Sequence, residues 1–353
     1  MTTLRPLTAN DEALLFEWRN HPEIIRLSAS RKAVTKDEHH QWMLRTLKDE
    51  NRLVYVIEHD ASPVGIVRFD RTATDQSQAE VGIYLLPPYL HKGIGSFALQ
   101  KAILMMLQRW PNLQRVKAKV RSDNTASIGF FKKFSFQTQK TPNQPPQEDL
   151  INLEASVEDL LKIINKSFYG SLVRSHQLSF KSLNWGSVES QNLRFRILSE
   201  FGNFSNAKLL DLGCGTGDFL KWLTEHQISV YYTGIDISEE MINVARNRFS
   251  AARFLVGDIS SPELEESYDI IVESGIFTIS TQHIFFDTLR RAFEKCTVGV
   301  AFNALSAWSP QKEEGECYLD PAVVLDFCKS LTRRVTLRHD YHPRDFTVYL
   351  YKQ

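Results

Sequence analysis

Cysteine and long apolar runs are scarce in this 353-residue sequence, and each absence excludes a class of protein. The four cysteines (Cys214, Cys296, Cys317 and Cys328) are widely spaced and form no C-x-x-C pair, which argues against a zinc site and a disulfide framework. No apolar run is long enough to span a bilayer, and the N-terminus lacks the apolar core of a signal peptide. We therefore expect a protein of the reducing cytoplasm, without a metal or a membrane partner.

Excess charge of either sign is also lacking. The 42 Lys and Arg residues balance the 42 Asp and Glu residues, and we find no clustered basic tract. This pattern argues against a nucleic acid bound mainly through its phosphates. The composition is otherwise that of a globular protein, and the length allows two domains. We expect small-molecule substrates.

The stretch KLLDLGCGTGDFL at residues 208–220 is the most informative part of the sequence. It predicts a short apolar strand, a turn with Gly213, Gly215 and Gly217, and a helix that begins near residue 218. Glycines allow the backbone to turn sharply and to approach a ligand closely, and the helix N-terminus behind them leaves N–H groups free. Asp236 ends a second predicted strand, where an acid binds the hydroxyls of a ribose.

The segment DLGCGTGD resembles motif I of the class I S-adenosylmethionine (SAM) methyltransferases. This resemblance implies a Rossmann-like fold that ends in an antiparallel hairpin, for which residues 334–339 and 346–351 alternate suitably. It implies that Asp211 faces the cationic amino-acid end of SAM and that Asp258 meets the adenine amine, although a turn aspartate is the alternative for Asp258. The residues expected at the SAM site are Asp211, Gly213, Gly215, Gly217, Asp236, Ile237, Asp258, Ile259, Glu273 and Arg194.

The rest of the second half suggests an acceptor pocket but no decisive base. We expect residues 167–190 to be irregular and to fold over the cofactor or the acceptor, with Tyr169, Trp185 and Gln191 available there. A loop at 304–320 carries Trp308 and Tyr318. Glu273, His283 and His339 are possible bases for methyl transfer, and each alone is more often structural or solvated.

The first half predicts hairpin-connected strands before a second glycine turn. Capping boxes begin helices near residues 8 and 35, and residues 19–33 are expected to form a loop. Strands are predicted at 53–59, 64–70 and 78–86, followed by the turn Leu90-His91-Lys92-Gly93-Ile94-Gly95-Ser96 and a long helix. A strand that enters a glycine turn and a helix N-terminus can hold a pyrophosphate.

This order resembles the GNAT acetyltransferase superfamily over about residues 3–154, which implies a mixed-sheet α/β fold and acetyl-CoA as cofactor. Leu90 replaces the polar residue usual before the turn, and Phe131 stands where a tyrosine often acts as general acid. The expected acetyl-CoA residues are Leu85, Leu86, His91, Gly93, Gly95, Ser96, Asn124 and Phe131.

A narrower resemblance concerns the GNAT subgroup that acetylates the 4-amino group of nucleotide-linked amino sugars in the pseudaminic and legionaminic acid pathways. It rests on residues 16–22 (FEWRNHP), on Glu38-His39 with Trp42, and on residues 64–69 (VGIVRF). Transfer to an amine needs a group that takes the proton. Glu80 is the first candidate base, unless it pairs with Arg68 or Arg71, and His39 is the second, although a lone helix histidine is more often structural.

The sequence thus predicts two α/β domains, a GNAT domain at 1–155 and a class I methyltransferase domain at 156–353, in a bifunctional enzyme of surface-glycan synthesis. A polar segment with three prolines at 138–149 is expected to be a loop before the last strand of the first sheet. The alternatives are acetylation of a protein or ribosomal-protein amine, and a methyltransferase whose GNAT half is degenerate.

Overall fold

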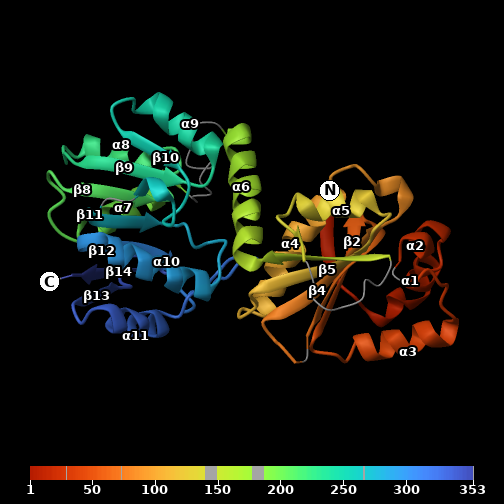
Figure 1. Ribbon diagram of the computed structural model, residues 1–353. Coiled ribbons are helices and arrows are strands. Elements are labelled where there is room, and N and C mark those ends of the chain that lie inside the picture. Colours follow the sequence, from red (N-terminus) through yellow and green to blue (C-terminus); the bar gives the residue numbers. More distant parts are fainter. Residues whose placement is uncertain (29, 73, 140–148, 177–186, 265–266, 353) are drawn as a thin grey trace. The chain divides into compact units, whose positions relative to one another are not determined.

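The computed structural model describes residues 1–28, 30–72, 74–139, 149–176, 187–264 and 267–352. The chain divides into two compact units, Met1–Ile163 and Ile164–Gln353, and each contains its own sheet (Figure 1). The predicted two-domain α/β fold is therefore confirmed, while the domain boundary near residue 155 stays a prediction. Among the described helices, none has both the length and the apolar character that crossing a bilayer requires.

The first unit is built on a mixed sheet with the strand order β1-β2-β3-β4-β5-β7-β6. All neighbouring strands are antiparallel except β4 and β5, which are parallel. A tight turn at Asp60 and Ala61, both with positive φ, joins β2 to β3 as the sequence predicted. The strands are β1 (Thr2–Pro6), β2 (Arg52–His59), β3 (Ser62–Arg71), β4 (Gln78–Leu85), β5 (Arg115–Arg121), β6 (Gln137–Thr138) and β7 (Leu150–Ser156).

Helices of the first unit bury apolar side chains against this sheet. Leu15, Trp18 and Met43 form one buried cluster with Val56 and Ile66 of the sheet. The helices are α1 (Glu12–Arg19), α2 (Pro22–Leu27), α3 (Lys36–Thr46), α4 (Ile94–Arg109) and α5 (Thr125–Lys132). The expectation of a loop over 19–33 is wrong at α2, which begins with a proline at its first position after the capping side chain of His21.

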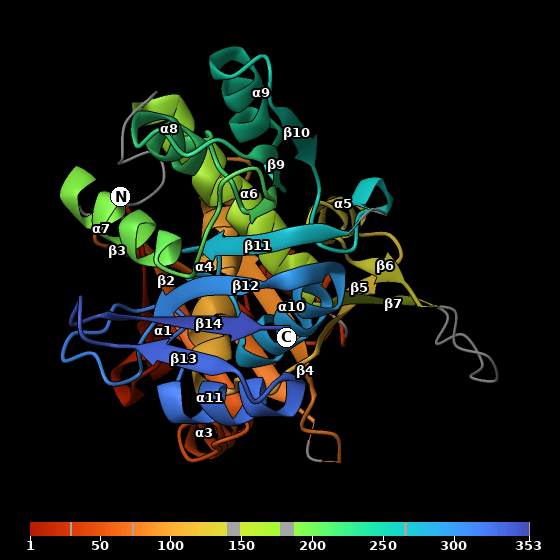
Figure 2. The same ribbon diagram turned by 90° about the vertical axis from the view of Figure 1, so that its left-hand side faces the viewer.

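The second unit has the strand order β10-β9-β8-β11-β12-β14-β13. Strands β8 to β12 are parallel and β14 runs antiparallel, and Figure 2 shows β11, β12, β14 and β13 side by side. The chain order reverses between β8 and β11, where open α/β sheets bind ligands. The strands are β8 (Lys208–Leu212), β9 (Tyr231–Asp236), β10 (Arg253–Val256), β11 (Tyr268–Ser274), β12 (Cys296–Leu305), β13 (Val335–Arg338) and β14 (Asp345–Tyr351). The predicted terminal hairpin, β13 with β14, is confirmed.

Two apolar clusters cover the two faces of this sheet. Leu209 and Val272 pack with Phe195 and Phe219 on one face, and on the other Leu212 and Phe302 belong to a cluster with Phe285 and Val324. The helices are α6 (Val157–His176), α7 (Val188–Ser199), α8 (Asp218–Glu225), α9 (Glu239–Arg248), α10 (Gln282–Lys295) and α11 (Pro321–Leu331). The irregular segment expected at 167–190 is wrong for residues 167–176, which continue α6, and for residues 188–190, which begin α7. Trp185 and most of the proline-rich loop lie outside the described residues.

Candidate functional site

Strands β4 and β5 part in the middle of the first sheet. They pair only at Gln78 with Arg115, Ala79 with Val116 and Glu80 with Lys117, although β4 continues to Leu85. On its other edge β4 stays paired with β3 as far as Leu85. The second half of β4 therefore offers a backbone edge, next to the gap, with which an extended ligand can pair as an added strand.

The glycine turn follows directly after this edge. Gly93 has φ +78° and precedes α4, and the helix start has no side-chain cap. A Cβ at Gly93 would meet nothing within 4 Å, whereas one at Gly95 would lie 3.5 Å from the Leu85 side chain. The first N–H groups of α4, near Gly95 and Ser96, thus suit an anionic group. His91 has a positive φ in the same turn.

The remaining expected acetyl-CoA residues have internal partners. Leu86 donates its N–H to the Val64 carbonyl (2.9 Å), and its own carbonyl accepts from Tyr89 (3.0 Å). Asn124 caps α5 by accepting a hydrogen bond from Ser127 N–H (3.0 Å). Phe131 is buried against Phe136. The contacts of Leu86, Asn124 and Phe131 therefore give each of these residues a structural role in the first unit.

The two candidate bases lie in different surroundings. Glu80 stands where β4 and β5 part and forms an ion pair with Lys119 (2.8 Å), not with Arg68 or Arg71. His39 is 5% exposed, its Nε2 lies 3.0 Å from the Glu12 carbonyl oxygen, and its ring stacks on Trp42. Burial lowers the pKa of His39. The geometry therefore favours Glu80, because His39 is held in the packing of α1 and α3.

In the second unit the glycine turn is crowded. Gly213, Gly215 and Gly217 all have positive φ. A Cβ at Gly213 would lie 1.9 Å from Ile276, and one at Gly217 would lie 3.1 Å from the Phe249 ring. Glycine is needed here for both the backbone conformation and the space.

Arg248, which the sequence analysis missed, holds this turn from the end of α9. Its Nη1 donates to the Thr216 carbonyl (2.6 Å), to Thr216 Oγ1 (3.0 Å) and to Asp218 Oδ1 (2.7 Å). Its guanidinium carbon also lies 5.2 Å from the Phe249 ring centroid. An arginine 30 residues after the turn carries no pattern by which the sequence would reveal this contact.

Two expected SAM acids lie at the ends of the strands next to the turn, and each accepts hydrogen bonds from neighbouring groups. Asp211 is 3% exposed and accepts a hydrogen bond from the Tyr232 hydroxyl (2.5 Å). Burial raises the pKa of Asp211 to about 7. Asp236 accepts from the backbone N–H of Gly215 (3.1 Å) and of Ser238 (2.8 Å). Burial also raises the pKa of Asp236, which these backbone N–H groups and the nearby Lys166 counteract.

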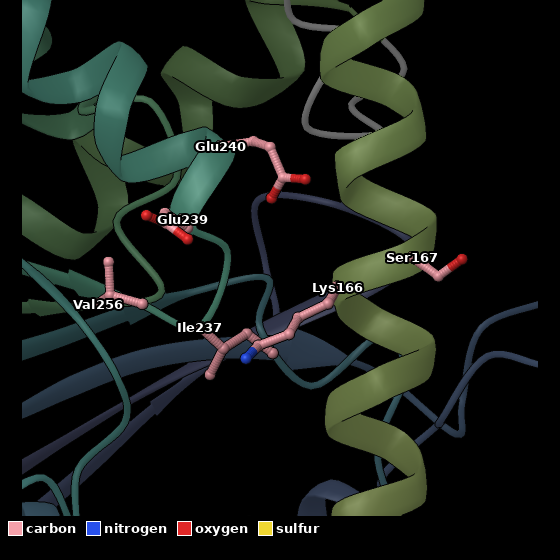
Figure 3. Close-up of a pocket in the computed structure, with 6 residues that line it drawn as sticks. All are labelled: Lys166, Ser167, Ile237, Glu239, Glu240 and Val256. Carbon is pink, nitrogen blue, oxygen red and sulfur yellow. The ribbon is translucent and has the colours of Figure 1, made fainter. Parts of the chain in front are cut away.

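A pocket of about 340 Å³ opens beside Ile237, the residue that follows Asp236. Ile237 and Val256 form its apolar part, and Glu239 and Glu240 come from the start of α9 (Figure 3). Lys166 extends from α6 toward Ile237, whereas Ser167 points away. The pocket thus has apolar side chains for a flat ring and an acid nearby for hydroxyl groups, which fits the adenosine half of SAM. The sequence analysis did not name Lys166, because it lies in a different segment of the chain from the glycine turn and Asp236.

The other expected SAM residues are spread around the carboxyl edge of the sheet. Asp258 forms a turn in which Oδ1 accepts from Ser260 N–H (2.8 Å), and Ile259 is 6% exposed. Glu273 is fully buried at the end of β11, and neither carboxylate oxygen has a hydrogen-bond partner among the described residues. Burial raises the pKa of Glu273 to about 8. Arg194 is buried in an ion pair with Asp345.

The two other candidate bases differ in exposure. His283 lies exposed at the start of α10. His339 is half-buried, and its Nε2 lies 2.7 Å from Ser306 Oγ. The structure therefore brings the glycine turn, Asp211, Asp236 and Ile237 together. It does not single out one of the three candidate bases for methyl transfer.

Comparison with known families agrees with this division. Residues 2–137 match the acetyltransferase (GNAT) domain model, and residues 209–297 match a methyltransferase domain model. Domains of these kinds use acetyl-CoA and SAM, and the geometry of the two turns fits both cofactors. Expected cofactors and expected enzyme classes are thus confirmed.

Individual proteins resemble each unit. The "Putative methyltransferase Rv1506c" of Mycobacterium tuberculosis is 32% identical over 154 residues, which are 40% of this chain and 91% of that protein. The acetyltransferase PseH of Campylobacter jejuni is 24% identical over 130 residues, 37% of this chain and 79% of that protein. A solved spermidine N-acetyltransferase from Vibrio cholerae, in complex with CoA and spermine, covers 45% of this chain and 98% of its own, with 17% identity and a TM-score of 0.39. The chain belongs to the family of the mycobacterial methyltransferase and joins to its methyltransferase domain an acetyltransferase domain of the GNAT superfamily.

Proposed function

We propose that the first unit acetylates an amine of a small molecule, namely the 4-amino group of a nucleotide-linked amino sugar. The observation that carries the acetylation is the parting of β4 and β5 beside the uncapped start of α4, with Glu80 on the gap. A thioester seated along β4 would bring its carbonyl to this gap, where Glu80 accepts the proton of the amine directly or through water. The sugar follows from the subgroup resemblance of residues 16–22 and 64–69, which the likeness to PseH supports.

We further propose that the second unit methylates a small molecule of the same surface-glycan pathway. Asp236 would accept the ribose hydroxyls of SAM, and the pocket beside Ile237 would hold the adenine. SAM supplies the methyl group, and this chain aligns the acceptor and excludes water, as an in-line displacement requires. The fusion of two transferases favours one pathway. Acetylation of a protein amine is the second candidate. A third is a GNAT domain without activity, and the departures at Leu90 and Phe131 are the sequence features that favour it.

The test is product analysis by mass spectrometry. Purified protein is incubated with acetyl-CoA, SAM and a panel of UDP- and CMP-linked 4-amino sugars, alongside the variants Gly93→Trp and Asp211→Ala. We expect an acetyl gain that only Gly93→Trp abolishes and a methyl gain that only Asp211→Ala abolishes. Transfer to peptides or ribosomal proteins, but to no sugar of the panel, would contradict the amino-sugar proposal. Methylation without any acetyl transfer would point to the degenerate GNAT half.

A further inference from the structure

An exposed tryptophan stands beyond the carboxyl end of β12, outside the cofactor site. Trp308 is 56% exposed, whereas Trp18, Trp110 and Trp222 are at most 6% exposed. An indole ring offers a large apolar face with a polar edge, so an exposed one that is held in a fixed place can bind another ring. Trp308 is the one tryptophan among the described residues that is largely open to solvent.

The backbone around Trp308 is fixed, so its exposure is built into the fold. Its N–H donates to Ser306 Oγ (3.1 Å), and the neighbouring Ala307 N–H donates to the Leu319 carbonyl (2.8 Å). Ser309 N–H donates to the Ser306 carbonyl (2.9 Å). Ser306 itself is fully buried and donates its N–H to the Arg344 carbonyl (2.7 Å).

The Trp308 ring packs on His339, which in turn packs on Phe346, and we call these three rings the column. The Trp308 and His339 ring centroids are 5.4 Å apart with an interplanar angle of 32°, and His339 lies parallel to the buried Phe346 at 6.4 Å. Ser306 Oγ accepts a hydrogen bond from the backbone N–H of Trp308 and is also hydrogen-bonded to His339 Nε2. One indole face is thus backed by the protein, and the side chain still keeps more than half of its surface open.

The position of the column matches an acceptor site. Strands β8, β11 and β12 are parallel neighbours, so the glycine turn after β8 and the loop after β12 lie at the same edge of the sheet. The pocket beside Ile237 lies past β8 on the opposite side, at β9 and β10. Trp308 is therefore on the half of the edge that lies away from Asp236 and from the pocket beside Ile237.

We propose that Trp308 is the platform on which a ring of the methyl acceptor stacks. This inference rests on the proposed function of the second unit. The ring would be one with an apolar face and a polar rim, which an aromatic surface in water binds by stacking. A nucleotide-linked sugar offers two such rings, the base of the carrier and the sugar, and both share this chemistry.

Kinetics of the full chain test the platform. Trp308→Ala is expected to raise the KM for the methyl acceptor by about tenfold or more, with Trp308→Phe between it and the wild type. The KM for SAM and the rate of acetylation are expected to stay unchanged, which a general loss of folding would not allow. Tyr231→Ala is the matched control, since Tyr231 is a 68% exposed aromatic residue at the opposite end of the sheet, where β9 begins.

Direct titration separates the two rings and does not depend on turnover. UDP alone and the free amino sugar alone are titrated into the wild type and Trp308→Phe, and the difference in fluorescence isolates the Trp308 signal. Quenching by UDP would assign the base, and quenching by the sugar would assign the sugar ring. If neither ligand changes the Trp308 signal and Trp308→Ala keeps the wild-type acceptor KM, the platform is wrong. If the wild type methylates no sugar but a ligand still quenches Trp308, the proposed reaction fails and the platform stands.

Discussion

The two glycine turns of this chain look alike in sequence but differ in their surroundings. At Gly93 the backbone has φ +78°, and an added Cβ would meet nothing within 4 Å. At Gly213 the backbone has φ +71°, and an added Cβ would lie 1.9 Å from Ile276. Arg248 and Phe249 crowd the second turn from another side. The first turn thus needs glycine for its conformation alone, and the second for conformation and for space.

The candidate acids of the two sites also differ, in how far they are exposed to solvent. Glu80 is about one-third exposed and forms an ion pair with Lys119. Asp211 and Glu273 are buried, and their pKa values are raised to about 7 and about 8. The comparison teaches that the first site is open and tolerant, whereas the second is enclosed and sensitive to volume and protonation.

The largest expected effect comes from Gly213→Ala. The added methyl group must displace Ile276 in a backbone conformation that alanine disfavours, so we expect loss of methylation and about 2–4 kcal/mol less stability of the second unit. Gly93→Ala is the matched control, with strain of about 1–2 kcal/mol and no clash. Thermal unfolding and both transfer assays check this. An equal loss of stability in Gly213→Ala and Gly93→Ala would contradict the claim that only the second turn needs glycine for space.

Glu80→Gln is expected to lower the kcat of acetylation by about 100-fold, the lower range for the loss of a general base. Methylation is expected to continue at the wild-type rate. Lys119→Met removes the partner of Glu80 but keeps the carboxylate, so its effect is expected to be smaller. Wild-type acetylation in Glu80→Gln would remove Glu80 from the reaction.

Arg248→Met is expected to weaken SAM binding by about tenfold, because the turn loses hydrogen bonds from a charged donor. Arg248→Lys, which keeps the charge but can make fewer of these bonds, is expected to lie in between. Calorimetric titration with SAM measures the change, and acetyl-CoA binding provides the control. Unchanged SAM affinity in both variants would mean that Phe249 and Ile276 hold the turn without Arg248.

The effect spread over the widest range of conditions is a fall in the stability of the second unit as the pH rises. Glu273 has a pKa of about 8 when folded against 4.5 as its ordinary value, so its neutral form favours the folded state. Its contribution is complete below about pH 4.5 and is lost as the pH rises through about 8. Between pH 5 and 8 this loss is expected to be on the order of 1–3 kcal/mol in the wild type and absent from Glu273→Gln, measured as the free energy of unfolding of the second unit. The same pH dependence in the variant would contradict a raised pKa of Glu273 in the folded state.

Local patterns predicted most elements of the fold. The capping box at Thr35 and Glu38 does begin α3, and the run at 115–121 is β5. The error at α2 has a physical origin, since six residues give too little apolar periodicity to stand out from a loop. The extension of α6 is not evident from the sequence, because the stretch that begins at Ser167 is rich in aromatic residues and lacks a clear apolar periodicity.

The candidate sites were predictable only where one segment carries them. The two glycine turns follow from strand, turn and helix signals in sequence order. Contacts between distant segments carry no such signal, as the pairing of Glu80 with Lys119, the clamp of Arg248 on Thr216 and the approach of Lys166 to Ile237 show. The column under Trp308 likewise needs His339, which follows it by more than 30 residues.

Calorimetric titration of both cofactors into the full chain tests the central claim most directly. The claim is that two independent cofactor sites share this polypeptide. We predict that acetyl-CoA and SAM each bind once per chain, that Asp236→Asn weakens SAM alone, and that Gly93→Trp weakens acetyl-CoA alone. Failure of either cofactor to bind the wild type, or one substitution that abolishes binding of both, would contradict the account.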